Sequence, residues 1–303
     1  MKTSVYYLLW ALFGVVIVAV IVVLAFSFQP QSVSARLASR AQRQEIVDQM
    51  RFHLASASDA EKSAVLATTD EDSRAFADRA RAESAAVERL RTEYGALPQT
   101  EKEKVLAGDF ARELSDYRKV DNELLDLAVR NTNIKAYTLA FGPAAEAADA
   151  MDAELSFVTE RSLASPTPDA LRVVRLATGA QHGVLRIQAL LPRHIAEESP
   201  EKMDELEARM EADNRLVEKD LEDLAALFPG DRHVETALAR FTQLKGLKSR
   251  ILALSRENSN VRSLSISLNE KRKLTALCQD TLTALEETIR EEKIAGENVV
   301  SPR

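Results

Sequence analysis

Two short stretches of this chain have nearly the same sequence, and this repetition limits the fold more than any other feature. "RNTNIKAYTLAF" begins at Arg130 and "ENSNVRSLSISL" begins at Glu257, a shift of 127 residues. Over residues 124–141 this shift gives four identities, and most other positions exchange similar residues. "ASASDAEKS" also corresponds weakly to "RLATGAQHG" at a shift of 120. The sequence therefore predicts a duplicated unit, so that both halves share one fold.

The spacing of apolar residues predicts that each unit is helical. Between the N-terminal region and the tail, apolar side chains recur at intervals of three and four, which is the pattern of helices in a bundle. Only 9 Gly and 9 Pro occur among 303 residues. Breaks such as "TTDEDS", "LPQT", "ASPTPD" and "FPGD" separate the predicted helices, and short connections imply antiparallel neighbours. We therefore expect an all-α chain with two tandem up-down four-helix bundles.

The breaks also give expected boundaries. Asp70 or Asp72 is the expected N-cap of the second helix, Pro192 is expected to end the fifth, and Ser199 with Pro200 to begin the sixth. The repeated stretches would form the turn between the third and fourth helices of each copy, and whether the bundles lie side by side or end to end stays open. The predicted domains are an anchor at 1–30, a first bundle at 31–165, a second bundle at 166–295 and a tail at 296–303.

The N-terminal region contains a long apolar stretch. Val5–Phe28, "VYYLLWALFGVVIVAVIVVLAFSF", has 24 residues and no charge. As a helix it would be about 36 Å long, enough to cross a bilayer. We expect an uncleaved transmembrane helix; the alternative is a signal peptide cleaved after "SVSA". Basic residues lie on both sides, so charge does not fix the orientation.

Composition argues against several functions. The net charge is −7 and no basic stripe occurs, so we expect no nucleic-acid partner. Cys278 is the single cysteine, which excludes a disulfide within the chain and a cysteine metal cluster. The sequence contains no nucleophile–base pair, P-loop or dinucleotide-binding turn. We therefore expect no enzymatic activity, no catalytic residues, no metal and no cofactor. Glu83 and Lys271 fall at apolar seam positions, where the pattern favours snorkelling at a bundle edge over a buried ion pair.

A family resemblance rests on the order of these features. A membrane span runs into a helix and a four-helix bundle, with "N-x-N-x-x-A-Y" from Asn131 to Tyr137 and a proline soon after. This order resembles the ligand-binding domain of bacterial methyl-accepting chemoreceptors. The resemblance covers roughly residues 5–160 directly and 170–292 through the repeat. It implies a single-pass protein of the bacterial inner membrane with its bundles in the periplasm, and a ligand site between the first and fourth helices.

Departures from that family limit what is carried over. Amino-acid-sensing members have arginines on the first helix, whereas residues 53–72 contain none that could clamp a carboxylate. The family's Gln-Pro-Thr at the junction is replaced by Gly142-Pro143-Ala144. The second copy does carry arginines on its first helix, although such residues also fit a solvated face. The two junction asparagines could instead fix register or cap helices. The candidate ligand-binding residues are Arg172, Arg175, Arg186, Asn131, Asn258 and Tyr137.

These features predict a membrane-anchored extracytoplasmic sensor module. It would contact the lipid bilayer through residues 5–28, bind a small molecule, and relay that binding to a separate membrane signalling protein or by self-association. Two alternatives stay open: a structural spacer or adaptor of an envelope complex, and the sensory fragment of a longer chemoreceptor.

Overall fold

The computed structural model describes residues 33–165 and 167–292. Within these ranges every element is helical, which confirms the all-α prediction. The predicted transmembrane stretch, Val5–Phe28, lies outside the described residues. No helix in the two ranges has the length and apolar character needed to cross a membrane.

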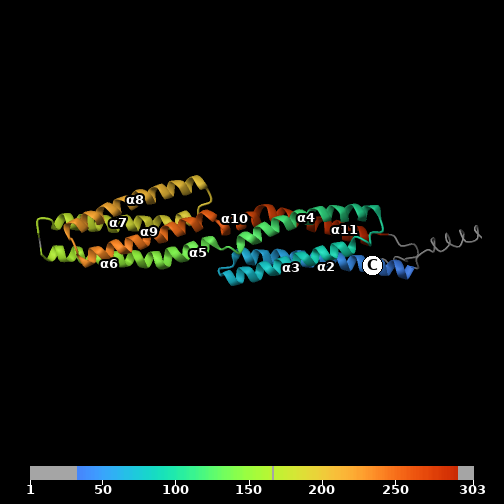
Figure 1. The fold of residues 1–303 in the computed structure, drawn as a ribbon. Coiled ribbons are helices and arrows are strands. Elements are labelled where there is room, and N and C mark those ends of the chain that lie inside the picture. Colours follow the sequence, from blue (N-terminus) through green and yellow to red (C-terminus); the bar gives the residue numbers. More distant parts are fainter. Residues whose placement is uncertain (1–32, 166, 293–303) are drawn as a thin grey trace, which may run out of the picture.

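One group of helices, called here the terminal bundle, contains both ends of the described chain (Figure 1). Its last helix is interrupted by a π-helical turn, η2. In the sequence, this last helix is separated from the first three by all the helices of the second bundle. The terminal bundle consists of α2 (Val33–Leu66), α3 (Asp70–Tyr94), α4 (Glu101–Ala128), α10 (Ser259–Ile266), η2 (Ser267–Lys271) and α11 (Arg272–Arg290).

The remaining helices form a second four-helix bundle, called here the inserted bundle, from one continuous stretch of chain. Its first helix carries the second π-helical turn, η1, and this turn falls 127 residues before η2. The inserted bundle consists of α5 (Thr132–Leu139), η1 (Ala140–Ala144), α6 (Ala145–Ala164), α7 (Ala170–Ile195), α8 (Pro200–Leu227) and α9 (Arg232–Glu257).

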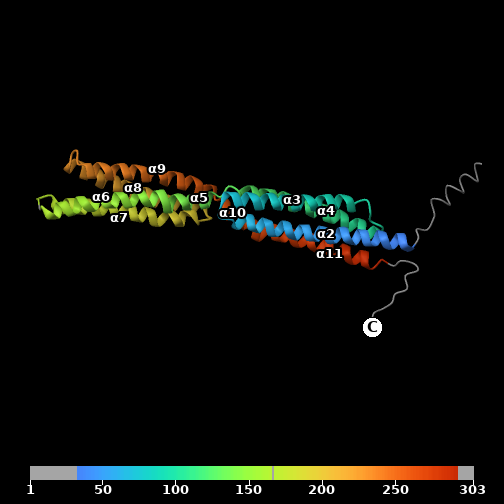
Figure 2. The same cartoon turned by 90° about the horizontal axis from the view of Figure 1, so that it is seen from below.

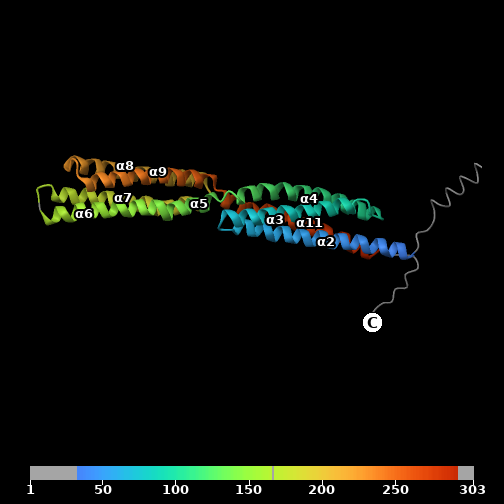
Figure 3. The ribbon, with the colours of Figure 1, turned by 60° about the horizontal axis from the view of Figure 1, so that its bottom comes forward.

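The two bundles are stacked end to end (Figures 1, 2 and 3). In all three views α4 runs on into α5, and α9 runs back into α10, so the chain crosses between the bundles twice. The predicted division into 31–165 and 166–295 is therefore wrong, as is the turn expected at each junction. The helices after Asn131 and Asn258 continue away from the bundle that the chain is leaving, because each finds its hydrogen-bond partners at the other junction rather than in a reversing loop.

Side chains at the helix starts explain most boundaries. The hydroxyl of Ser199 accepts a hydrogen bond from Lys202 N at 3.3 Å, which confirms this predicted start with Pro200 in the first turn. At α3 the prediction was wrong by one or more residues, because Thr69 rather than an aspartate is the N-cap and accepts from Asp72 N.

The predicted stop at Pro192 was also wrong, since α7 continues to Ile195. A proline inside a helix removes a backbone hydrogen bond and crowds the preceding turn. The residues that follow Pro192 nevertheless stay helical because His194 and Ile195 are fully buried. Tertiary packing therefore outweighs the local preference at this position.

The cores of the two bundles differ. The inserted bundle has one apolar cluster that extends from Ala136 near the junction to Val158 near the far tip. The terminal bundle has two: one around Tyr117 and Leu282, the other an alanine-rich cluster around Leu124. Between these two clusters the terminal bundle buries charged side chains, namely Glu61, Asp121 and Lys271. The candidate site lies in this polar layer.

Candidate functional site

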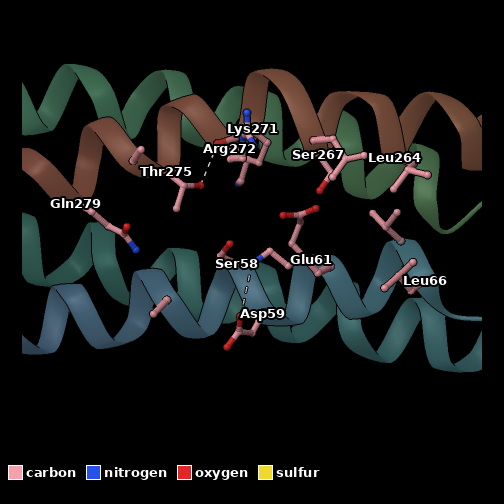
Figure 4. A pocket seen from close by; sticks show the side chains of 15 residues that line it. Ser58, Asp59, Glu61, Leu66, Leu264, Ser267, Lys271, Arg272, Thr275 and Gln279 are labelled. Carbon is pink, nitrogen blue, oxygen red and sulfur yellow. Dashed lines mark hydrogen bonds and ion pairs between the residues drawn. The ribbon is translucent and has the colours of Figure 1, made fainter.

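A cavity of about 540 Å³ opens between α2 and the interrupted last helix of the terminal bundle (Figure 4). This volume lies within the range of roughly 300–1,000 Å³ that is common for small-molecule sites. Leu66 and Leu268 line it and are more than half exposed, so the cavity reaches the surface. It therefore joins the solvent to the polar layer of the bundle.

The sequence of both walls explains why the helices leave space here. On α2 the wall includes two small side chains, Ala55 and Ser58. On the opposite side the π-helical turn η2 adds a residue to the helix, which shifts the side chains that follow it. As a result Ser267 and Lys271, at the two ends of η2, are both buried and both line the cavity.

Glu61 is the most unusual side chain of the cavity wall. It is 1% exposed, and its Oε1 atom has no hydrogen-bond partner among the described residues. Figure 4 shows its carboxylate pointing from α2 into the space opposite η2. Burial raises the pKa of the Glu61 carboxyl, while the Ser267 hydroxyl and the charge of Lys271 act in the opposite direction. Glu61 is thus a buried acceptor with unused capacity.

Lys271 is committed to a different partner. Its ammonium group forms an ion pair with Asp121 on α4, and both side chains are almost fully buried. The Nζ atom also lies 3.1 Å from the centroid of the Tyr117 ring, a cation–π contact. Burial lowers the pKa of Lys271 to about 8, against the opposing effect of Asp121. This contradicts the prediction that Lys271 would snorkel at a bundle edge.

The rim of the cavity is mixed in character. Asp59 and Lys62 lie one helical turn apart on α2, with 3.8 Å between carboxylate and ammonium. Arg272 lines the cavity from α11 and is exposed. Leu264 and Val65 add apolar surface. A molecule in this cavity would therefore meet apolar walls, an inner carboxylate and an outer edge that carries both signs of charge.

The two chain crossings form a second polar cluster at the boundary between the bundles. Asn131 and Asn258 precede α5 and α10 and have left-handed backbone conformations, with φ of 51° and 50°. Asparagine tolerates this conformation better than most residues. These two are the only non-glycine residues with positive φ in residues 33–165 and 167–292.

The crossings cap one another. Thr132 N donates to the Ser259 hydroxyl at 3.1 Å, and Ser259 N donates to the Thr132 hydroxyl at 3.0 Å. In the next position Asn133 N donates to Asn260 Oδ1 and Asn260 N to Asn133 Oδ1, both at 3.1 Å. Each helix start thus satisfies its free backbone donors with side chains of the other start. This reciprocal capping explains why the sequence repeats at this place.

The structure separates the predicted ligand-binding residues from the cavity. Asn131 and Asn258 are buried at the junction, where Asn131 Nδ2 donates to Asp70 Oδ1 at 3.1 Å and Asn258 Nδ2 donates to Glu197 O at 2.9 Å. Tyr137 is half-buried, stacks on Phe141 and donates to Pro192 O at 3.4 Å.

The three arginines lie on α7 of the inserted bundle, and all are exposed. Arg186 pairs with Asp213 on α8 at 2.8 Å. Burial raises the pKa of the Asp220 carboxyl, and the charge of Arg175 acts in the opposite direction. None of the six candidates lines the cavity, and no group of His, Cys, Asp or Glu in the described ranges could hold a metal ion.

Sequence reasoning missed Glu61 and Asp121. Glu61 directly follows Ala60, a member of the apolar seam of α2, so a slightly wider buried stripe would have included it. Asp121 lies four residues after Tyr117 and three before Leu124, which places it on the same apolar face of α4. The available sequence signal was a charged residue in or beside the apolar seam of each helix, Glu61 on α2 and Asp121 on α4.

The chain is similar to a known protein family and to a solved structure. A solved crystal structure of the TorS sensor domain–TorT complex in the presence of TMAO is similar at 9% identity and a TM-score of 0.35; the match covers 84% of this chain and 100% of that chain. No curated protein matches. The family model described as a four helix bundle sensory module for signal transduction matches residues 3–163, which is more than half of the chain. This confirms the family expected from the sequence: the chain belongs to the four-helix-bundle sensory modules for signal transduction.

Proposed function

We propose that this chain is a membrane-anchored extracytoplasmic sensor in which a small ligand occupies the cavity of the terminal bundle. The observation that supports the proposal is the buried carboxylate of Glu61, which faces an open cavity between the first and last helices of that bundle and has one oxygen without a partner among residues 33–165 and 167–292. A structural bundle does not need this arrangement, because buried charges without full pairing destabilise a fold. The proposal assigns no enzymatic activity and no nucleic-acid partner.

The ends of the cavity helices offer a route for output. The Arg40 guanidinium donates to Arg290 O, and Arg43 pairs with Glu292, so the start of α2 lies against the end of α11. Arg43 also forms a doubly hydrogen-bonded ion pair with Glu103 of α4, at 2.6 and 2.7 Å. A ligand that alters the spacing of α2 and α11 would act on helices joined at their far ends. Displacements of about 1–2 Å are typical of such packed helices.

The proposed location and partner follow from the sequence. The charge-free stretch Val5–Phe28 supports insertion into a bilayer, and the chemoreceptor resemblance supports a bacterial inner membrane with the bundles on the periplasmic side. We propose that the bound state is relayed to a separate membrane signalling protein or through self-association. The end-to-end stacking of two bundles favours one alternative, an elongated spacer or adaptor in an envelope complex.

Thermal unfolding of the full chain in detergent micelles tests the proposal. The chain is screened against amino acids, organic acids, amines and aromatic compounds. We expect at least one compound to raise the melting temperature saturably, because a ligand that binds only the folded state stabilises it. Thr275→Phe, which fills the cavity, should abolish the response, whereas Thr283→Phe on the same helix outside the cavity wall should keep it. Silence of all compounds, or a response that Thr275→Phe retains, would favour the adaptor.

A further inference from the structure

The inserted bundle provides an internal comparison for the cavity. The repeat shift of 127 places Ala144 at the position of Lys271 and Lys248 at the position of Asp121, and the shift of 120 places Gln181 at the position of Glu61. The amide nitrogen of Gln181 is partnered, since Nε2 donates to Asp152 Oδ1 at 2.8 Å and to the Ser156 hydroxyl at 3.1 Å. The same architecture therefore forms without a buried carboxylate at any of these positions.

The buried carboxylates of the described ranges differ in their pairing. Glu61, Glu103 and Asp121 are each 1% exposed or less. Glu103 pairs with Arg43 and Asp121 pairs with Lys271. Glu61 forms no ion pair within residues 33–165 and 167–292, and it is the one of the three that faces the cavity. Burial of an unpaired carboxylate is costly, so this position suits a positively charged group.

The other charges around the cavity do not reverse this preference. Lys271 is held by Asp121, and Lys62 extends to the surface beside Asp59. An anion placed in the cavity would lie against Glu61, while the Lys271 ammonium is already paired with Asp121. Apolar side chains also line the cavity, where they would contact the body of a ligand; these are Val65, Leu66, Leu264 and Leu268.

Building on the proposed sensory function, we propose that the ligand is an organic monocation, an ammonium group on an apolar body, and that its ammonium group donates to Glu61. A charge-assisted hydrogen bond of this kind is stronger than a neutral one. The apolar body lies against the leucines and Val65. This ligand class differs from the carboxylate ligands that arginine clamps select, and it follows from the buried carboxylate of Glu61.

The proposal implies that affinity rises with pH. Burial raises the pKa of Glu61, so the carboxyl is neutral below that raised value and charged above it. A cation gains its counter-charge only in the charged form. The charged groups that face Glu61 or border the cavity are Asp59 and Lys62 on α2, Lys271 on η2, Arg272 on α11 and Asp121 on α4.

Isothermal titration of the full chain in detergent micelles tests the ligand class. The probes are 2-phenylethylamine, 2-phenylethanol and 3-phenylpropionate, which have similar apolar bodies and differ in charge. We expect the amine to bind at least about tenfold more tightly than the other two, as a charge-assisted hydrogen bond allows. Glu61→Gln should remove that advantage. Glu113→Gln, which neutralises another carboxyl of the same bundle outside the cavity wall, should keep it.

Three results would overturn the ligand class: no binding of the amine at millimolar concentration, equal or tighter binding of the alcohol or the acid, or an amine affinity unchanged by Glu61→Gln. These results are distinct from failure of the sensory function. If another compound still stabilises the chain and Thr275→Phe abolishes its effect, the sensor stands and only the ligand class falls. If no compound stabilises the chain, both proposals fall.

Discussion

Glu61 links the stability of this protein to pH. The carboxyl is buried, one of its oxygens has no partner in the part of the chain that the structure describes, and burial raises its pKa above the ordinary value of 4.5. Between these two values the folded chain retains a proton that the unfolded chain has released. The contribution of this carboxyl to stability is therefore fully present below the ordinary pKa and is lost as pH rises through the raised pKa.

Glu61→Gln should accordingly change stability in a pH-dependent way. Below the ordinary glutamate pKa we expect similar free energies of unfolding for the variant and the parent, because both side chains are neutral. At mildly alkaline pH we expect the variant to be more stable by about 1–3 kcal/mol, the range for a buried group with an unmet partner. Urea unfolding across this pH range measures the difference. A parallel pH dependence of the two proteins would show that Glu61 titrates normally.

The Asp121–Lys271 pair leads to a different expectation. Lys271→Met alone leaves Asp121 buried without a partner and should destabilise the fold by about 3–5 kcal/mol. The double variant Asp121→Leu with Lys271→Met removes both charges and should recover most of that loss. Urea unfolding of the two single variants and the double variant gives the coupling energy. Additive losses would mean that the two charges do not depend on each other.

At the scale of elements, the two junctions are defined by backbone conformation. Asn258 has a φ of 50°, whereas Asn260, two residues later, lies inside α10. Both side chains bridge the two junctions: Asn258 Oδ1 accepts from Asn133 Nδ2 at 2.7 Å, and Asn260 Nδ2 donates to Asn131 Oδ1 at 3.0 Å. A substitution that removes either side chain therefore loses similar contacts, and the backbone alone distinguishes the positions.

The alanine and glycine variants should therefore rank in opposite orders of stability at these two positions. At position 258 we expect Asn258→Gly to be more stable than Asn258→Ala by about 1 kcal/mol, because alanine is strained in the left-handed region. At position 260 we expect Asn260→Ala to be more stable than Asn260→Gly by about 1 kcal/mol, the helix propensity difference. Chemical denaturation of the four variants measures both orders. The same order at both sites would contradict the assigned conformation of Asn258.

Most elements were predictable because periodicity and capping are local signals. The apolar seams and the Ser199–Pro200 start depend on residues within one or two turns. Features that depend on distant contacts were not predictable. The helix continues past Pro192 because other helices bury His194 and Ile195. Lys271 can be buried because it pairs with Asp121 on α4, which is 150 residues away in the sequence. The cavity and the role of Glu61 in it could not be predicted without knowing that α2 packs opposite η2.

At the scale of the whole molecule, the sequence-based prediction was wrong mainly in which helices it assigned to each bundle. The helices α5–α6 and α10–α11 have apolar residues at corresponding positions of the repeat. On the basis of the apolar pattern alone, α4 could therefore pack with either of them. The structure pairs α4 with α10 and α11, which are 127 residues later in the repeat than α5 and α6. The sequence signal that remained was the polar motif at the junctions, where Asn133 and Asn260 recognise each other.

Cysteine crosslinking with a short bismaleimide distinguishes the two arrangements. In a Cys278→Ser background, Arg51→Cys and Glu286→Cys place one thiol on α2 and one on α11, at positions whose native side chains form an ion pair. We expect the bismaleimide to join this pair within one chain, because an ion pair of two long side chains spans more than a direct disulfide can. Arg51→Cys with Thr159→Cys uses the corresponding position on α6 and serves as the matched control, which should stay unlinked. Mobility on denaturing gels gives the outcome, and crosslinking of the second pair would support sequential bundles.

The insertion of one bundle within the other has a consequence for biosynthesis. Residues 132–257 leave the ribosome as a complete up-down bundle, while the first three helices of the terminal bundle still lack their partner. At about 5–20 residues per second this interval lasts on the order of ten seconds. During that time the apolar faces of α2, α3 and α4 have no fourth helix to cover them. We therefore expect the nascent chain to need chaperone protection until the final helix is translated.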